Sequence, residues 1–275
     1  MGRRLGQHFL AIKSILDRIA EAACADRVPL LIERRPSVIE TQPSVVIEIG
    51  PGKGSLTESL LECAGRVVAI ELDAYLVHYL AQRFREPIEQ GRLTLVEGDI
   101  LKTDLLKWGA PSDGREIVIA GNLPYYITSP ILEKLFSLGD VWRRAVFMMQ
   151  AEVAARITAQ PGSRDFGYLS VQTQLMSRPE ILFAVPRTAF RPPPKVDSAV
   201  VRLVPRDAAS DFGVTDRAGF LRFASACFRY KRKTLRNNLA PMYGAERVDQ
   251  MPEAGLRAEA LGVAQLAAIY RRLVV

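Results

Sequence analysis

The sequence of 275 residues contains no long hydrophobic run. Its longest apolar stretches, such as VVIEIG at 45–50, are short and contain acidic side chains, whereas a membrane-spanning helix needs about 20 consecutive apolar residues. The first residues are basic but contain no apolar segment of the kind found in secretory signals. We therefore expect a cytoplasmic protein that makes no membrane contact.

Cysteine is scarce, with three residues in the whole chain. Cys24, Cys63 and Cys227 are far apart and form no C-x-x-C pair, and three is not the even number that a disulfide framework requires. Each lies among Ala and Leu in a segment that is predicted to be helical. The pattern excludes a zinc site, so we expect no metal, three buried free thiols and a reducing compartment.

The net charge is +7, and one segment accounts for it. Residues 178–236 contain 13 Lys and Arg against 5 Asp and Glu, whereas the rest of the chain contains 24 against 25. The cluster FRYKRKTLR at 228–236 is typical of proteins that bind nucleic acid, although a solvated surface is the alternative. At helical spacing four of its side chains share one face, which we expect to contact phosphates: Arg229, Arg232, Lys233 and Arg236.

Hydrophobic residues make up 48% of the chain, enough for a sizeable core. After a predicted helix at about 12–24, strand-like and helix-like runs alternate, which predicts a parallel, doubly wound sheet with helices on both faces. Residues 179–204 are predicted to form a closing β-hairpin, and the pattern is wholly helical from about residue 216. We therefore predict an α/β domain at 1–205 and a small all-α domain at 206–275.

The first predicted strand ends in the glycine-rich turn GPGKG, which contains Gly50, Gly52 and Gly54. Glycine permits backbone conformations closed to other residues and allows a ligand to approach the main chain. The spacing does not fit the dinucleotide motif G-x-G-x-x-G, and a purely structural turn is the alternative. Glu71 ends the second strand, 21 residues after Gly50, where an acidic side chain binds ribose hydroxyls.

The next two predicted strands also end in polar residues. Asp99 follows the third strand and can accept a hydrogen bond from an adenine amine, although a helix or turn cap is the alternative. Asn122 follows the fourth strand and opens the motif Asn122-Leu123-Pro124-Tyr125, which would by itself indicate only a turn. Four successive strand ends with such residues favour a ligand site at that edge of the sheet.

This constellation resembles the Rossmann-like class I S-adenosylmethionine-dependent methyltransferases. The motif NLPY resembles the signature of enzymes that methylate exocyclic amines of bases. The resemblance implies that the Asn122 side chain and the neighbouring backbone carbonyl accept the two N–H bonds of the amine, which directs its lone pair at the methyl group. It also implies that the Tyr125 ring stacks on a base that has left its helix or loop.

Further motifs resemble the ribosomal RNA adenine N6,N6-dimethyltransferase family: GQHFL at 6–10, DFGYLSV at 165–171, VPRTAFRPPPKVDSAVVRL and FRYKRKTLRNNL. The resemblance runs from Gly6 to the C-terminus, and it implies that the α/β domain at 1–205 is the methyltransferase domain and that the helical domain at 206–275 binds rRNA. It implies that Phe190 offers a second aromatic face to the adenine, beside the catalytic motif Asn122, Leu123, Pro124 and Tyr125. It also implies that S-adenosyl-L-methionine is held by His8, Leu10, Gly50, Gly52, Glu71, Asp99 and Asn122.

Within that family the sequence most resembles the bacterial small-subunit branch. The resemblance implies dimethylation of two adjacent adenosines in a 3′-terminal hairpin loop of 16S-type rRNA, by a monomer that binds a precursor of the small ribosomal subunit. Two alternatives are a large-subunit methyltransferase of the macrolide-resistance type and a non-catalytic ribosome assembly factor. A DNA amine methyltransferase is disfavoured by Leu123, where such motifs usually have proline.

Overall fold

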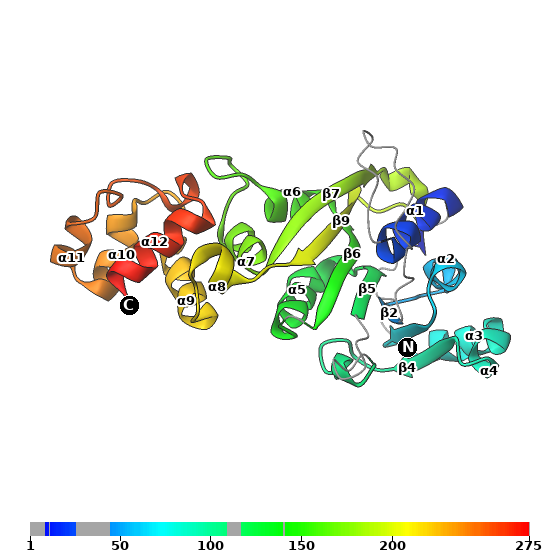
Figure 1. Ribbon diagram of the computed structural model, residues 1–275. Helices are drawn as coiled ribbons and strands as arrows, with labels where there is room; N and C mark the ends of the chain where they lie inside the picture. The colour runs from blue at the N-terminus through cyan, green and yellow to red at the C-terminus, as the bar shows by residue number, and fades with distance from the viewer. Residues whose placement is uncertain (1–8, 11, 26–44, 109–116, 140, 275) are drawn as a thin grey trace, which may run out of the picture. The chain divides into compact units, whose positions relative to one another are not determined.

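The computed structural model describes residues 9–10, 12–25, 45–108, 117–139 and 141–274 (Figure 1). The contacts divide the chain into two compact units. The first consists of residues 1–151 and 181–204, and the second of residues 152–180 and 205–275. The two units therefore interleave in the sequence, and residues 152–180 group with the C-terminal helices. The division at 205/206 and its assignment to rRNA binding remain predictions.

A seven-stranded sheet forms the centre of the first unit, in the order β4-β3-β2-β5-β6-β9-β7. The five strands from β4 to β6 are parallel, and β9 is antiparallel to β6. The prediction of a mainly parallel sheet with a closing hairpin is confirmed. The strand bounds are Val45–Ile49 for β2, Val67–Glu71 for β3, Leu93–Glu97 for β4, Ile117–Asn122 for β5, Trp142–Gln150 for β6, Ser177–Val185 for β7 and Ser198–Pro205 for β9.

Every residue of β2 and β3 is buried, which explains why their sequences are continuous apolar runs rather than alternating ones. One core cluster contains residues of three neighbouring strands, Val46, Val118 and Val146, together with residues of α1 and α2. The helices of this unit are α1 (Lys13–Cys24), α2 (Ser55–Cys63), α3 (Ala74–Arg83), α4 (Arg85–Glu89) and α5 (Thr128–Ser137), and Figure 1 shows α1 and α2 together on one side of the sheet.

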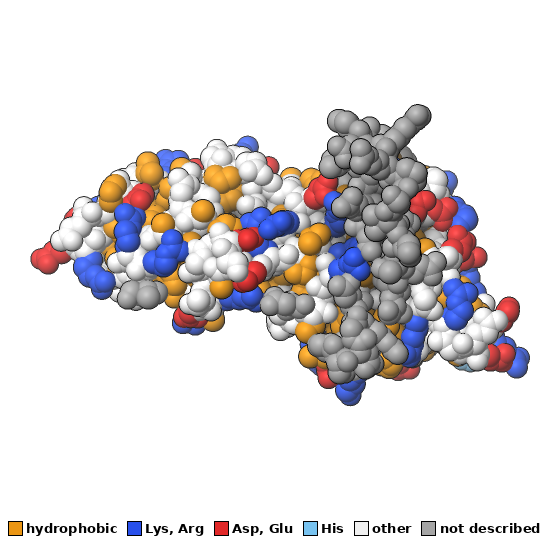
Figure 2. Space-filling view, in the orientation of Figure 1, with side chains coloured by type: hydrophobic (Ala, Val, Ile, Leu, Met, Phe, Trp, Pro, Cys, Tyr) orange, Lys and Arg blue, Asp and Glu red, His pale blue; other side chains and the backbone are white. Residues whose placement is uncertain are grey.

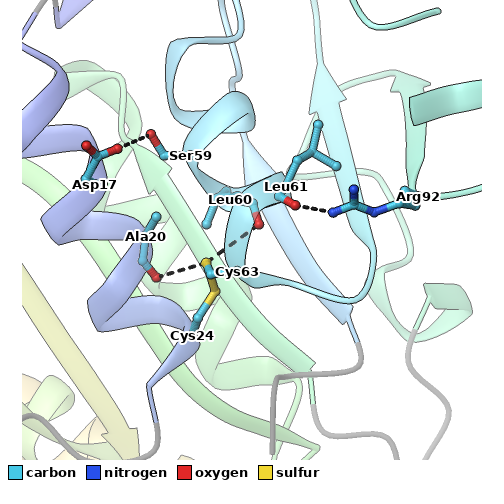
Figure 3. Close-up of a disulfide and its surroundings, with 8 residues drawn as sticks. All are labelled: Asp17, Ala20, Cys24, Ser59, Leu60, Leu61, Cys63 and Arg92. Carbon is cyan, nitrogen blue, oxygen red and sulfur yellow. Dashed lines mark hydrogen bonds between the residues drawn. A yellow bond between two sulfur atoms is a disulfide. The ribbon is translucent and has the colours of Figure 1, made fainter. Parts of the chain in front are cut away.

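A disulfide joins Cys24, at the end of α1, to Cys63, at the end of α2 (Figure 3). The Cα atoms are 6.0 Å apart, within the range for such a bond. The prediction of three free thiols is therefore wrong for this pair, and the cysteines do not support the expected reducing compartment. The two residues are 39 positions apart in the sequence, and only the packing of the helices brings them together. Cys227 is free and buried, as predicted.

The second unit is helical, which confirms the predicted fold class. Its core contains the rings of Phe220, Phe223 and Tyr270, whose centroids are 5.6 to 6.3 Å apart. The helices are α6 (Ala151–Thr158), α7 (Tyr168–Met176), α8 (Ala208–Phe212), α9 (Arg217–Cys227), α10 (Leu235–Tyr243), α11 (Ala245–Asp249) and α12 (Val263–Leu273).

The predicted helix through the basic cluster is wrong, because α9 ends at Cys227 and α10 begins at Leu235, with turns between them. The side chain of Asn238, 5% exposed, provides the physical reason. Its Nδ2 donates to the carbonyl oxygens of Cys227 and Tyr230, and its Oδ1 accepts the Tyr230 N–H at 3.0 Å. These bonds satisfy backbone groups that a continuous helix would otherwise pair.

Candidate active site

The four strand ends singled out in the sequence lie at one edge of the sheet. Ile49 of β2 pairs with both Ile70 and Gly121, and Glu71 pairs with Glu97. Because these strands are parallel, their carboxyl ends meet at the same edge. The structure thus places Gly50, Glu71, Asp99 and Asn122 at the carboxyl ends of four neighbouring strands, as predicted.

The glycine-rich turn has the backbone that its sequence requires. Gly50, Gly52 and Gly54 have φ values of 65°, 60° and 82°, in the left-handed region that favours glycine. At Gly54 a Cβ would also lie 2.4 Å from the ring of Phe84. The turn leads directly into α2. The three glycines are therefore a structural requirement, and the turn they form lies at the predicted ligand edge.

Only 7% of Glu71 is exposed, and its buried carboxylate accepts hydrogen bonds from three backbone N–H groups. Oε1 accepts from Leu72 and Asp73, at 2.9 and 3.0 Å. Oε2 accepts from Gly52 at 3.1 Å, which ties the end of β3 to the glycine-rich turn. A carboxylate oxygen has two lone pairs, and Oε2 accepts this one bond among the described residues. Its second lone pair is available to a ribose hydroxyl.

Asp99 is partly exposed and caps the turn that follows β4. Its Oδ1 accepts the Leu101 N–H at 2.9 Å, so the capping interpretation is correct for this oxygen. Among the described residues, none donates a hydrogen bond to Oδ2. This second oxygen can therefore accept a hydrogen bond from an adenine amine. One carboxylate can therefore both shape the turn and bind a ligand.

The residues of the motif at the end of β5 differ in how exposed they are and in which bonds they form. Asn122 is partly exposed, whereas Leu123 is 1% exposed and donates its N–H to the Met148 carbonyl at 2.9 Å. The Leu123 side chain is therefore part of the core, and only its backbone can contact a base. The Pro124 carbonyl accepts the Ile127 N–H, which closes a single 3₁₀ turn, Tyr125–Ile127.

Known proteins are similar to this chain over nearly its whole length. Residues 2–273 match the model of a family described as ribosomal RNA adenine dimethylase. The chain belongs to this family. Its members are S-adenosylmethionine-dependent methyltransferases, so the prediction of an enzyme of this class is confirmed.

Several relatives are similar to this chain over almost their whole length. The chain is 42% identical to ribosomal RNA small subunit methyltransferase A of Acidobacterium capsulatum, over 98% of the chain and 90% of that protein. A solved dimethyladenosine transferase from Plasmodium falciparum is 26% identical with a TM-score of 0.74, covering 98% of this chain and 99% of that one. The solved 23S rRNA methyltransferase ErmE is 25% identical with a TM-score of 0.69, covering 96% and 99%.

One residue beside Tyr125 is not indicated by any sequence motif. The Tyr125 hydroxyl lies 2.7 Å from the Ser198 hydroxyl, which is fully buried at the start of β9. Burial raises the pKa of Tyr125, and the bond to Ser198 opposes part of that rise, so the phenol stays protonated. The two residues are 73 positions apart, and no local spacing connects them. Ser198 fixes the hydroxyl end of the predicted stacking ring.

Glu48 is a second missed residue, two positions before the glycine-rich turn. It is 1% exposed, and its Oε2 accepts a hydrogen bond from the Thr57 hydroxyl of α2 at 2.6 Å. Burial, with a smaller contribution from the negative charge of Glu71, raises the pKa of Glu48 to about 8. The carboxyl group is therefore mostly protonated at neutral pH and can donate as well as accept.

Two further predicted residues lie in a small antiparallel pair, β1 (Phe9–Leu10) with β8 (Phe190–Arg191). Leu10 faces Phe190 across the pair, and they are 5% and 1% exposed. The Phe190 ring therefore packs in the core, and an adenine can stack on it only if neighbouring side chains move. Its stacking role remains a prediction. His8 lies outside the described residues.

The basic cluster is exposed but does not form the single face that was predicted. Arg236 binds Asp249 through two bonds, Nε to Oδ1 at 2.5 Å and Nη2 to Oδ2 at 3.1 Å, which partly neutralises its charge. Arg229, Arg232 and Lys233 lie in the turns before α10 and are exposed. Figure 2 shows Lys and Arg side chains scattered over the visible face of this unit. Phosphate contacts by these residues remain a prediction.

Among residues 9–10, 12–25, 45–108, 117–139 and 141–274, no three His, Cys, Asp or Glu side chains come together as metal ligands. Over the same part of the chain, no helix combines the length and the apolar character needed to cross a bilayer.

Proposed function

We propose that the enzyme transfers methyl groups from S-adenosylmethionine to N6 of two adjacent adenosines in the 3′-terminal hairpin loop of small-subunit rRNA. The observation that carries the proposal is the position of Asn122 and Tyr125 at the carboxyl end of β5, on the same sheet edge as the glycine-rich turn and Glu71. A donor bound at that turn and a base held at Asn122 would meet at one edge.

The donor side of the site consists of carboxylates and backbone. Glu71 Oε2 accepts from the ribose hydroxyls, and Asp99 Oδ2 accepts from the adenine amine of the donor. The positive φ values of the glycine-rich turn bring backbone, rather than side chains, against the ligand. Because Glu71 is already held by three N–H groups, little reorganisation is needed on binding.

The acceptor side must activate an amine whose lone pair is delocalised into the ring. The Asn122 side-chain carbonyl and the Leu123 backbone carbonyl accept its two N–H bonds, which shifts the nitrogen toward tetrahedral geometry. The nitrogen then forms a bond to the methyl carbon while the carbon–sulfur bond breaks, and the electron pair goes to sulfur. The methylated nitrogen carries a positive charge and releases its proton to solvent, so no strong base is required.

The small-subunit reaction is favoured over the alternatives by the relatives. The curated relatives in the 38–43% identity range carry the name small subunit methyltransferase A, whereas the large-subunit enzyme ErmE is 25% identical. A complete set of candidate donor-binding and catalytic residues lies at one edge of the sheet, which argues against a non-catalytic assembly factor. These residues are Asn122, Tyr125, Glu71 and Asp99. We propose that the enzyme acts as a cytoplasmic monomer on a precursor of the small subunit.

One experiment tests the reaction and its target together. The protein and labelled methyl donor are incubated with small subunits, large subunits and duplex DNA from a strain that lacks the modification, and the modified base is mapped. We expect label only in small-subunit rRNA, as N6,N6-dimethyladenosine at two adjacent positions. Label in large-subunit rRNA, in DNA or in no substrate would contradict the proposal.

A further inference from the structure

The second unit contains a cavity of about 680 Å³ that the methyl-transfer site does not use. Its walls come from α6, from the turn before α7 with the first residues of that helix, and from Phe228 and Lys231 in the turns after α9. All of these residues belong to one compact unit, so the cavity is complete within it. The volume lies in the range of small-ligand pockets.

Side-chain to backbone bonds hold the three walls together. The Ser170 hydroxyl donates to the Arg156 carbonyl at 2.6 Å and accepts the Gly167 N–H at 3.0 Å. Lys231 Nζ donates to the Arg164 carbonyl at 3.0 Å, which ties the basic cluster to the turn before α7. The cavity is thus shaped in advance rather than left to loose surface loops.

Aromatic rings line the apolar part of the cavity. Phe166 is 1% exposed, and its ring centroid lies 6.2 Å from that of Phe228, with the planes inclined at 58°. Phe228 and Tyr168 are both partly exposed and line the cavity. A flat ligand such as a nucleobase can stack on rings of this kind, and stacking tolerates any base because every base has a π face.

The polar part of the cavity carries more positive than negative charge. The charged residues of its lining are three basic ones, Arg156, Arg164 and Lys231, and two acidic ones, Glu152 and Asp165. Arg156 forms an ion pair with Glu152, so the two charges largely offset one another. Arg164 and Lys231 are exposed and can contact phosphate oxygens, while the Asp165 carboxylate can accept N–H groups of a base.

We propose that this cavity binds one unpaired nucleotide of the rRNA substrate, with its base on Phe228 and Tyr168 and its phosphate between Arg164 and Lys231. The proposal rests on the function proposed above, because it assigns that function's RNA a second point of contact, away from the methylated adenine. Cations beside accessible rings favour a nucleotide over an acidic peptide, which would use the cations but not the stacking surface.

The test compares two variants of the cavity with a control of equal charge. Arg164→Ala/Lys231→Ala removes the phosphate contacts, and Phe228→Leu removes the ring while keeping an apolar side chain. Arg222→Ala/Arg257→Ala removes two exposed charges elsewhere in the same unit. Binding to unmethylated small subunits is measured over a range of salt concentrations, and ultraviolet crosslinking followed by mass spectrometry identifies the peptides that contact RNA.

We expect Arg164→Ala/Lys231→Ala to weaken binding at least fivefold and to flatten the salt dependence by about one to two units, because each lost phosphate contact removes close to one counterion. Phe228→Leu should weaken binding without changing the salt slope, and the control should change affinity less than twofold. In the parent protein, a nucleotide should be crosslinked to a peptide containing Tyr168 or Phe228.

Three results would overturn the inference: parental affinity and salt slope in Arg164→Ala/Lys231→Ala, no crosslink at either aromatic residue, or competition by polyglutamate as effective as that by single-stranded RNA. The last would identify a site for acidic peptides. Failure of the proposed function is distinguishable, since the parent protein would then fail to methylate small subunits. Thermal unfolding of each variant checks that Phe228→Leu remains folded.

Discussion

The backbone N–H of Gly52 donates a hydrogen bond to Glu71 Oε2 at 3.1 Å. This bond joins the two features of the donor site that the sequence places 19 residues apart. It gives the glycine-rich turn a second role, because the turn positions the carboxylate as well as making room for a ligand. The donor site is therefore one hydrogen-bonded unit, and a change in Glu71 affects both of its parts.

Replacement Glu71→Gln should weaken S-adenosylmethionine binding by about 1 to 3 kcal/mol, the effect of removing a charge-assisted hydrogen bond. The amide NH2 group of Gln is a hydrogen-bond donor, so it would face the donating Gly52 N–H or the donating ribose hydroxyl without forming a bond. Isothermal titration calorimetry measures the affinity. Glu97→Gln, on the neighbouring strand and exposed, is the matched control and should bind as the parent does. Equal affinities of the two variants would contradict the ribose assignment.

Replacement Asn122→Ala should lower kcat by roughly tenfold or more and leave the affinity for small subunits nearly unchanged, since the amide acts mainly in the transition state. Asn122→Asp keeps an oxygen acceptor and should lose less activity. Single-turnover methylation and a filter-binding assay separate the two quantities. A variant that loses affinity but not turnover would assign Asn122 to RNA binding instead.

Replacement Ser198→Ala should lower kcat about fivefold, the equivalent of one hydrogen bond of about 1 kcal/mol. The fully buried Ser198 does not reach solvent, so the effect comes through the position of the Tyr125 ring. Tyr125→Phe should have a similar effect, and the double variant should be no worse than either single one, because both remove the same bond. Additive losses would show that the two hydroxyls act independently.

Replacement Glu48→Gln should change how stability depends on pH. The folded protein keeps the Glu48 proton up to a pKa of about 8, against an ordinary value of 4.5. The raised pKa means that the unfolded chain releases this proton first, so the contribution of Glu48 to stability is complete below about pH 4.5 and is lost as the pH rises toward 8. The loss is at most about 1.4 kcal/mol per pH unit.

Urea unfolding of the parent and of Glu48→Gln at pH 5 and pH 8 tests this expectation. Gln does not titrate, so the variant should gain stability relative to the parent between the two pH values. Thr57 and Glu71 are the groups that influence the carboxyl group, and both are unchanged in the comparison. Parallel pH profiles would show that Glu48 is ionised in the folded protein.

Reduction of the Cys24–Cys63 disulfide should lower the free energy of unfolding by about 2 to 4 kcal/mol, because the bond closes a long loop in the unfolded chain. Part of this loss is offset, since Cys63 Sγ lies 3.5 Å from the Ala20 carbonyl oxygen (Figure 3) and the reduced thiol, unlike a disulfide sulfur, has a hydrogen to donate. Thermal unfolding with and without reductant measures the effect, and Cys24→Ala/Cys63→Ala should not respond to reductant.

The order of helices and strands was predictable because it depends on periodicities local to each segment. Continuous β-branched runs predicted the buried strands, of which β2 and β3 are examples. Parallel connections require the strand ends to share an edge, so the sequence alone groups Gly50, Glu71 and Asn122. The turn at Gly54 was equally local, because a positive φ selects glycine.

The tertiary structure alone decided the contacts between distant residues. Nothing in the sequence pairs Ser198 with Tyr125 or Cys24 with Cys63, since each contact depends on how whole elements pack. The same is true of the basic cluster, where buried Asn238 binds backbone groups that helical spacing assigned to a helix. Local periodicity determines which helices and strands form. Which distant side chains meet depends on how these elements pack, because the polar groups buried between them must find hydrogen-bond partners.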